Sequence, residues 1–219
     1  QWKFVYQHSS MPDLRVQEGE NIAIEKITKE NLELRHAVKR RTVELENKTR
    51  ELEIETSLEK VRAVAMGMKK AQDMLDVCRI ISDELEKLGV AEIRNVQTAI
   101  INERKGIYLN YEYFRLPKKK IITAVEYRKQ KDIAAFVRRM LRDSEGFFTK
   151  NFKAAELKKW ISYQTSFGQY VDPKTRKTSS LHYYFYSIGP GALGISSYVP
   201  LSREAVSLFK RFRNVFQLT

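Results

Sequence analysis

The sequence has a single cysteine, Cys78, among its 219 residues, which excludes an internal disulfide and favours a reducing compartment. It has no run near the roughly 18 to 20 apolar residues that a membrane span requires, and its start lacks the pattern of a signal peptide. We therefore expect a cytoplasmic segment that does not cross a membrane. Because the chain begins at Gln1 without a methionine, we interpret it as part of a longer protein. A membrane anchor elsewhere in that protein is compatible with this interpretation.

Histidines are also scarce, with three in the chain. His8, His36 and His182 are too few and too scattered for a zinc site with one cysteine, and no H-E-x-x-H or C-x-x-C spacing occurs. His36 invites comparison with the phosphoacceptor histidine of sensor kinases, but Ala37 follows it where such helices have an acid. We predict no metal, no cofactor and an unphosphorylated His36.

The glycines cluster in one place, Gly189-Pro190-Gly191-Ala192-Leu193-Gly194, which superficially matches the phosphate-binding pattern G-x-G-x-x-G. Pro190 lacks an amide donor, and an apolar run follows instead of a helix, so we interpret the segment as a hairpin turn. The sequence also lacks a Walker lysine motif and any convincing set of acid, base and nucleophile. We therefore predict that the chain is not an enzyme.

Charge is present in excess, but only in part of the chain. The first 69 residues hold 13 Lys and Arg against 12 Asp and Glu, whereas the remaining 150 hold 27 against 15. The basic runs Lys118-Lys119-Lys120, Lys158-Lys159 and Lys174-Arg176-Lys177 fall on different predicted elements. A solvated surface explains them, and the alternative is a nucleic-acid-binding module in which they converge on one face.

Residues 20–70 have no proline, one glycine and a dense mixture of Glu, Lys, Arg and Leu, which predicts a long helix. Apolar residues at spacings of three, four or seven form one stripe of a supercoiled helix. A second stripe, one residue out of phase, follows a phase break near residues 52–58. The predicted dimer seam combines members of both stripes: Ile24, Ile27, Leu34, Val38, Leu45, Leu52, Leu58 and Val61.

An isolated helix of this length has nothing of its own to cover such a stripe, so we expect a parallel homodimer. The alternative is a helix that folds back on its own domain. The polar residues Asn31 and Arg41 interrupt the seam, and we expect alternative helix arrangements there and at the phase break.

Residues 71–219 form the predicted globular domain, while residues 1–19 are a linker or a strand remnant of an upstream region. The period of the apolar residues alternates between that of helices and that of strands. Helices are predicted at 71–88, 132–142, 154–163 and from 202, strands at 96–101, 107–114, 121–126, 146–149, 181–188 and 192–199, and a flexible loop at 172–180. The fold class is α+β: a central antiparallel sheet flanked by helices.

Aromatic residues are abundant in the second half of this domain. In a strand, Tyr183 and Phe185 point to one face, and Tyr184 and Tyr186 point to the other. Core packing explains one face without any ligand. The alternative is a small-molecule pocket lined by Phe147, Trp160, Tyr163, Tyr183 and Phe185, because hydroxyls near apolar walls suit a planar ligand.

The segment Ser57-Leu58-Glu59-Lys60-Val61-Arg62-Ala63-Val64-Ala65-Met66-Gly67-Met68, followed by the predicted helix that ends in Lys87-Leu88-Gly89-Val90, resembles a recurring segment of bacterial signal-transduction proteins. There it joins a coiled coil to a GAF-like sensor domain. Arg41-Thr42-Val43-Glu44-Leu45 is similar to the R-T-x-E-L opening of linker coils in such kinases. The resemblance covers residues 40–219 and implies a GAF fold upstream of an output domain, either a histidine kinase or a nucleotide cyclase.

The sequence departs from two GAF subtypes. It has no counterpart of the N-K-F-D-E pattern of cyclic-nucleotide binders and no Cys-His pair to hold a bilin, so neither ligand is carried over. The resemblance implies a non-catalytic sensor in a two-component or similar system, which relays a conformational signal through the paired helices to an output domain outside this chain.

Overall fold

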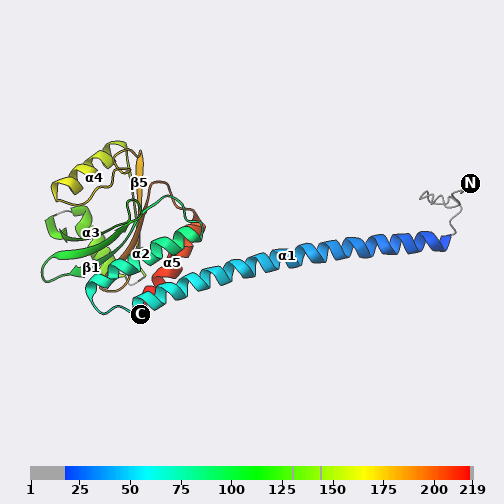
Figure 1. Cartoon of the computed structure of the whole chain (residues 1–219). Helices are drawn as coiled ribbons and strands as arrows, with labels where there is room; N and C mark the ends of the chain where they lie inside the picture. Colours follow the sequence, from blue (N-terminus) through cyan, green and yellow to red (C-terminus); the bar gives the residue numbers. More distant parts are fainter. Residues whose placement is uncertain (1–17, 130, 144, 218–219) are drawn as a thin grey trace, which may run out of the picture. The chain divides into compact units, whose positions relative to one another are not determined.

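The computed structural model describes residues 18–129, 131–143 and 145–217 (Figure 1). The strand remnant expected within residues 1–16 lies outside this part of the chain. The chain divides into two units, Gln1–Leu52 and Glu53–Thr219. The second unit starts well before residue 71, where the sequence places the start of the domain, because it includes the last turns of the long helix.

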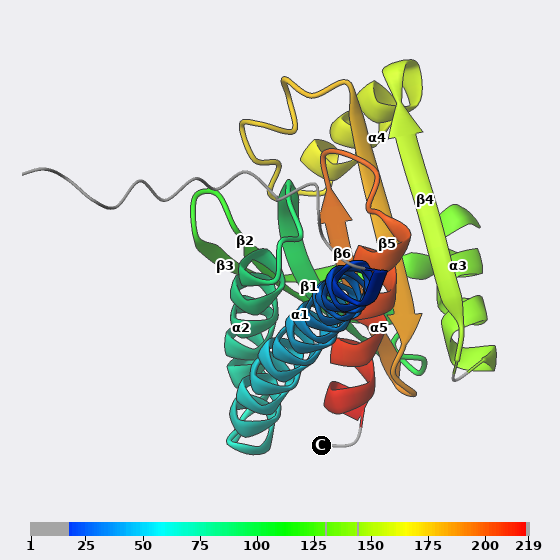
Figure 2. The same cartoon turned by 90° about the vertical axis from the view of Figure 1, so that its right-hand side faces the viewer.

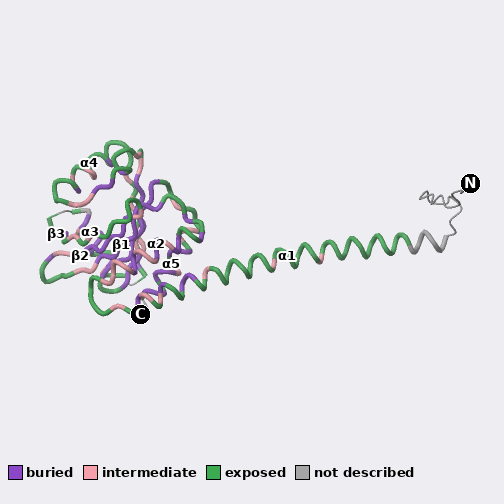
Figure 3. The backbone as a smooth tube through the Cα atoms, in the orientation of Figure 1, coloured by how far each residue is buried: buried purple, intermediate pink, exposed green. Residues whose placement is uncertain are grey.

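The long helix α1 (Glu18–Met66) forms as the composition predicts. Its large apolar residues from Ile24 to Leu52 are exposed, whereas Leu58, Val61 and Ala65 are buried. Figure 3 shows the same change from exposed to buried along the helix. The phase break near residues 52–58 therefore coincides with the point from which apolar residues of the helix are buried. In the described chain, no helix is both long and apolar enough for a membrane span.

The sheet has six antiparallel strands in the order β3-β2-β1-β6-β5-β4. Each of the six strands pairs with a strand next to it in sequence, and β1 pairs with β6 at the centre, so β1–β3 and β4–β6 join into one sheet. The strands are β1 (Ile93–Asn102), β2 (Ile107–Phe114), β3 (Lys119–Glu126), β4 (Phe147–Lys153), β5 (Ser180–Ser187) and β6 (Gly191–Ser197). The α+β class predicted from the sequence is confirmed.

One face of the sheet is covered by the end of α1 together with α2 (Met74–Lys87) and α5 (Arg203–Gln217) (Figure 2). A short 3₁₀ turn, η1 (Ala71–Asp73), precedes α2, so the helix predicted from residue 71 begins in this tighter form. The main core of the molecule lies on this face. Its fully buried members include Val61, Ile81, Leu85, Leu193, Ile195, Phe209 and Phe212.

The other face carries α3 (Lys131–Arg142) and α4 (Ala154–Ser166), with a second 3₁₀ turn, η2 (Tyr127–Lys129), before α3. Two smaller apolar clusters join these helices to the sheet. Alternation along β5 divides its aromatic residues as predicted: Tyr184 and Tyr186 belong to the main core, and Tyr183 and Phe185 face α3 and α4.

The turn between β5 and β6 is the hairpin connection expected at Gly189-Pro190-Gly191. Gly189 has φ of +83°, which favours glycine. A Cβ at Gly191 would overlap the backbone oxygen of Ala99 on the neighbouring strand. Gly189 therefore serves the turn, and Gly191 allows the close approach of the neighbouring strand.

Candidate ligand cavity

A cavity of about 610 Å³ lies between the sheet and the helices α3 and α4. This volume is in the range that small-molecule sites occupy. Aromatic side chains make up much of its wall: Tyr108, Phe136, Phe148, Phe152, Trp160, Tyr163, Tyr183 and Phe185. The cavity is therefore a chemically suitable place for a planar ligand.

The aromatic side chains are packed against one another. The Phe152 and Trp160 rings are stacked with centroids 4.8 Å apart and planes 8° apart. Tyr163 continues this stack on the next turn of α4, 5.4 Å from Trp160. Because each ring is held by a neighbour, the wall keeps its shape without a ligand.

The sheet contributes a polar surface to the cavity. Tyr108, Asn110 and Glu112 alternate along β2 and therefore share one face, and Gln97 lies opposite Glu112 on β1. The Asn110 amide donates to Gln97 Oε1 at 2.9 Å. Asn95, on the same strand as Gln97, donates to Glu112 Oε1 at 2.9 Å. This surface is thus ordered by amide hydrogen bonds.

Glu112 is only 7% exposed, and its burial raises the pKa of its carboxyl to about 7. The charge of Arg94 and hydrogen bonds from Asn95 and Asn110 act in the opposite direction and offset part of this effect. The carboxyl therefore keeps its proton to a higher pH than an exposed glutamate does.

Beside the cavity, Arg94 is buried in a polar cluster with the loop that follows α4. Its Nε donates to Asp172 Oδ2 at 2.7 Å and to Thr175 Oγ1 at 2.8 Å. The Tyr198 hydroxyl donates to Asp172 Oδ1 at 2.6 Å. The sequence predicts a flexible loop at 172–180, but Asp172 and Thr175 are fully buried. Since Arg94 is distant in sequence, local composition does not reveal this anchor.

The arginine connects this cluster to the cavity wall. Arg94 Nη1 donates to the Tyr183 hydroxyl at 3.3 Å, and Trp160 Nε1 donates to the same oxygen at 3.1 Å. Both partners are donors only, so the oxygen accepts twice. No acceptor for the hydroxyl proton of Tyr183 lies within hydrogen-bonding distance among the described residues.

Gln164 of α4 also lines the cavity, and it is 6% exposed. Its Nε2 donates to Gln169 Oε1 at 3.4 Å, but its own Oε1 is buried and has no hydrogen-bond partner in the described chain. A buried polar atom without a partner is costly and uncommon. Among the residues that the structure describes, it is one of three such atoms, with Ser82 Oγ and Arg94 Nη2.

Four of the five residues predicted for a pocket line this cavity: Trp160, Tyr163, Tyr183 and Phe185. Phe147 does not. It packs against Tyr186, 4.6 Å between ring centroids, on the opposite face of the sheet, and its neighbour Phe148 lines the cavity instead. The prediction for Phe147 is wrong because strand β4 begins there and alternation sends adjacent side chains to opposite faces.

Four polar residues of the cavity wall, Gln97, Asn110, Glu112 and Gln164, were not predicted from the sequence. A signal for two of them exists in β2, where Asn110 and Glu112 alternate with Leu109, Tyr111 and Tyr113. Such alternation is typical of a strand with one solvated face, so the sequence pattern by itself does not show that α3 and α4 cover these side chains.

The predicted dimer seam divides into two groups. Ile24, Ile27, Leu34, Val38, Leu45 and Leu52 are between 57% and 68% exposed. Leu58 and Val61 are 4% and 0% exposed because they pack in the main core of their own domain. Assigning these two residues to the seam is therefore wrong, since no surface of theirs remains for a partner.

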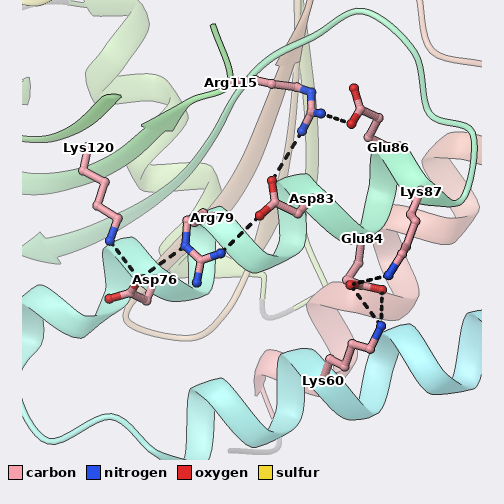
Figure 4. Close-up of polar contacts among 9 residues, drawn as sticks. All are labelled: Lys60, Asp76, Arg79, Asp83, Glu84, Glu86, Lys87, Arg115 and Lys120. Atoms are coloured by element: carbon pink, nitrogen blue, oxygen red, sulfur yellow. Dashed lines mark hydrogen bonds and ion pairs between the residues drawn. The ribbon is translucent and has the colours of Figure 1, made fainter. Parts of the chain in front are cut away.

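Polar contacts hold the end of α1 to α2. Glu84 of α2 is 4% exposed and accepts a hydrogen bond from Ser57 Oγ at 2.7 Å. Lys60 lies 3.2 Å and Lys87 lies 3.4 Å from Glu84 Oε1 (Figure 4). Burial acts to raise the pKa of Glu84, but Ser57 and Lys60 outweigh it and the pKa is lowered. The carboxylate thus stays ionised at neutral pH.

Three lysines of the basic runs contact acidic or aromatic side chains of the same chain. Lys120 pairs with Asp76 at 2.8 Å, and Lys174 pairs with Glu92 at 2.6 Å. Lys119 Nζ lies 4.3 Å from the centroid of the Tyr170 ring. These contacts partly neutralise the two lysine runs and give no observation in favour of a nucleic-acid site.

The cysteine and two of the histidines lie in the described part of the chain. Cys78 is fully buried, and burial raises the pKa of its thiol to about 12. His36 is exposed on α1, and His182 contacts Asn151 and Ser180. Within the described ranges, no group of three or more His, Cys, Asp or Glu residues is arranged to hold a metal ion.

No protein family model matches the chain, and no curated protein matches its sequence.

Proposed function

We propose that this chain is a non-catalytic sensor and dimerisation region of a bacterial signal-transduction protein. In this proposal, a GAF-like domain formed by the second unit senses a small molecule in its cavity. The paired helices then relay the change to an output domain outside the chain, such as a histidine kinase or a nucleotide cyclase. The GAF-like assignment is supported by the resemblance of Ser57 to Met68 to the segment that joins coiled coils to such domains.

The observation that carries the proposal is the burial of Leu58, Val61 and Ala65 in the core of the cavity-bearing unit. These residues belong to the same continuous helix as the exposed apolar stripe. A change in the packing of this core therefore changes the contacts of the part of α1 that it contains.

Strand β5 offers a physical route between cavity and helix. Tyr183 and Phe185 line the cavity, while the adjacent Tyr184 and Tyr186 pack in the cluster that includes Leu58 and Val61. Because protein cores are close-packed, a displacement on one face of this strand changes the contacts on the other face. Ligand binding needs only a difference in affinity between two helix arrangements to bias the output.

The upstream stripe supplies the dimerisation part of the proposal. Six large aliphatic residues repeat along one side of the helix and are more than half exposed in the single chain. Pairing with a second copy would bury all six on each helix, and burial of one such side chain contributes about 1.5 to 3 kcal/mol. The polar residues Asn31 and Arg41 interrupt this stripe, and the alternative arrangements of the two helices that a relay requires are expected there.

The test is to replace Val38 and Leu45 with lysine and measure the molar mass by light scattering. We expect the unaltered chain to be a dimer and the double variant to dissociate, with a dissociation constant raised by at least about 100-fold. His36→Lys with Asn47→Lys is the matched control, because both positions are exposed on the same helix but lie outside the stripe. A monomeric unaltered chain, or an equally stable dimer of the stripe variant, contradicts the proposal.

A further inference from the structure

Two residues that line the cavity, Tyr183 and Gln164, each carry a hydrogen-bonding group that the protein leaves unused. The Tyr183 oxygen accepts from Arg94 and Trp160, so the remaining capacity of its hydroxyl is to donate its own proton. Gln164 Oε1 is buried without a donor. One group therefore lacks an acceptor and the other lacks a donor, and a bound molecule that supplies both would recover the cost of their burial.

The formal charges of the cavity lining balance, with Lys150 and Lys159 against Glu112 and Glu156, so they favour no charged ligand in spite of the net charge of +13 on the whole chain. Arg94, the buried cation beside the cavity, is already paired with Asp172 at 2.7 Å. Glu112, one of the two carboxyls that line the cavity, has no cationic partner within ion-pairing distance among the described residues, and burial raises the pKa of its carboxyl. A ligand carboxylate near it would add repulsion in a medium of low dielectric constant.

The shape of the wall favours a flat molecule. Phe136, Phe148 and Phe185 contact one another with ring centroids 4.7 to 6.4 Å apart. Trp160 lies in the second aromatic group, with Phe152 and Tyr163. A planar ring system entering the cavity would meet aromatic faces and edges from both groups.

We propose that the cavity binds a neutral, planar heteroaromatic molecule that donates a hydrogen bond to Gln164 Oε1 and accepts one from the Tyr183 hydroxyl. This inference rests on the proposed function, in which the cavity is the sensing site, and adds the chemical class of what is sensed. Lactam-bearing ring systems have this combination of a donor and an acceptor, and they carry no charge at neutral pH.

The experiment measures the binding of five probes to the full chain by ligand-observed NMR and by thermal shift. Three probes are neutral lactams of increasing size: 2-quinolone, hypoxanthine and lumichrome. Naphthalene has the flat shape without polar groups, and naphthalene-2-carboxylate adds a negative charge. We expect at least one lactam to bind about tenfold or more tightly than either naphthalene probe, as one lost hydrogen bond to a buried group implies.

The variant Gln164→Met separates a ligand-binding role from a structural one. It removes the unpartnered oxygen at nearly constant side-chain volume, so the ligand-free protein should keep its melting temperature or gain in it. The affinity for the bound lactam should fall about tenfold. A structural role for Gln164 predicts the reverse pattern, a lower melting temperature with unchanged affinity. Gln72→Met, the same substitution at an exposed position that does not line the cavity, is the control and should change the affinity less than about twofold.

Three outcomes overturn the inference: no lactam binds, naphthalene-2-carboxylate binds best, or Gln164→Met binds the lactam as well as the unaltered chain. Any of these with an intact dimer leaves the helix relay standing, because the relay test depends on the stripe alone. Conversely, lactam binding to a chain that is monomeric supports the ligand class and contradicts the relay.

Discussion

Arg94 Nε lies 2.7 Å from Asp172 Oδ2, and both side chains are 1% exposed. This ion pair joins the start of β1 to a loop 78 residues later in the chain. The same arginine donates to Tyr183 in the cavity wall. The pair therefore holds the loop after α4 against the sheet and positions one of the two groups on which the proposed ligand contact depends.

We predict that Asp172→Ala lowers the free energy of unfolding by about 3 to 5 kcal/mol, because it leaves the Arg94 charge buried without a partner. Replacing both residues, Arg94→Met with Asp172→Leu, should recover much of this loss, since no uncompensated charge remains. Urea unfolding monitored by tryptophan fluorescence measures both values. A double variant as unstable as Asp172→Ala would show that the pair is not the origin of the effect.

Glu112 should make the protein less stable as the pH rises. Its folded-state pKa is about 7 against an ordinary value of 4.5, so the folded state binds more protons than the unfolded state between these pH values. The contribution to stability is present below the unfolded pKa and is lost as the pH rises through 7. At about 1.4 kcal/mol per pH unit, the loss is on the order of 3 kcal/mol between pH 4.5 and 8.

The measurement compares Glu112→Gln with the unaltered chain by urea unfolding at pH 5 and pH 8. The variant should gain in relative stability at pH 8, because its side chain does not ionise. Glu103→Gln, in the exposed turn after β1, serves as the control with no such change. Equal pH dependence in Glu112→Gln and the unaltered chain would mean that Glu112 is not buried in solution.

Glu84 should determine how firmly the end of α1 is held to α2. Removing its carboxylate in Glu84→Ala leaves Ser57 without its acceptor and weakens the attraction to Lys60 and Lys87. We expect a loss of about 1 to 3 kcal/mol and faster amide hydrogen exchange in residues 57–65. The surface pair of Glu86 with Arg115 (Figure 4) provides the matched control, since Glu86 is 54% exposed, and Glu86→Ala should cost less than about 1 kcal/mol.

The contribution of Glu84 also has a defined pH dependence. Its pKa is lowered in the folded state, so its stabilising effect is present above the ordinary carboxyl pKa and is lost as the pH falls through the folded value. The difference in stability between Glu84→Gln and the unaltered chain should therefore shrink in acid. A difference that grows in acid would contradict the assignment of the ionised carboxylate.

Two leucines of α1 should respond oppositely to truncation. Leu58→Ala creates a cavity in the core of the domain, so it should lower the free energy of unfolding of the domain by about 2 to 5 kcal/mol. Leu45→Ala should leave the domain stability within about 0.5 kcal/mol, because this side chain is 62% exposed in the single chain. Domain unfolding by urea and molar mass by light scattering separate the two effects, and a destabilised domain in Leu45→Ala would contradict this assignment.

The order of helices and strands, and which residues share a face within each element, could be predicted from the local sequence pattern. Periodicity of 3.6 or 2 depends on local geometry, so it predicted the long helix, the β2 strand and the division of Tyr183 and Phe185 from Tyr184 and Tyr186. It could not determine what covers each face. Only the tertiary structure showed that Leu58 and Val61 pack in their own domain, that Phe147 lies away from the cavity, and that Glu112 and Gln164 are buried. These outcomes depend on contacts between residues far apart in the chain, which local periodicity does not encode.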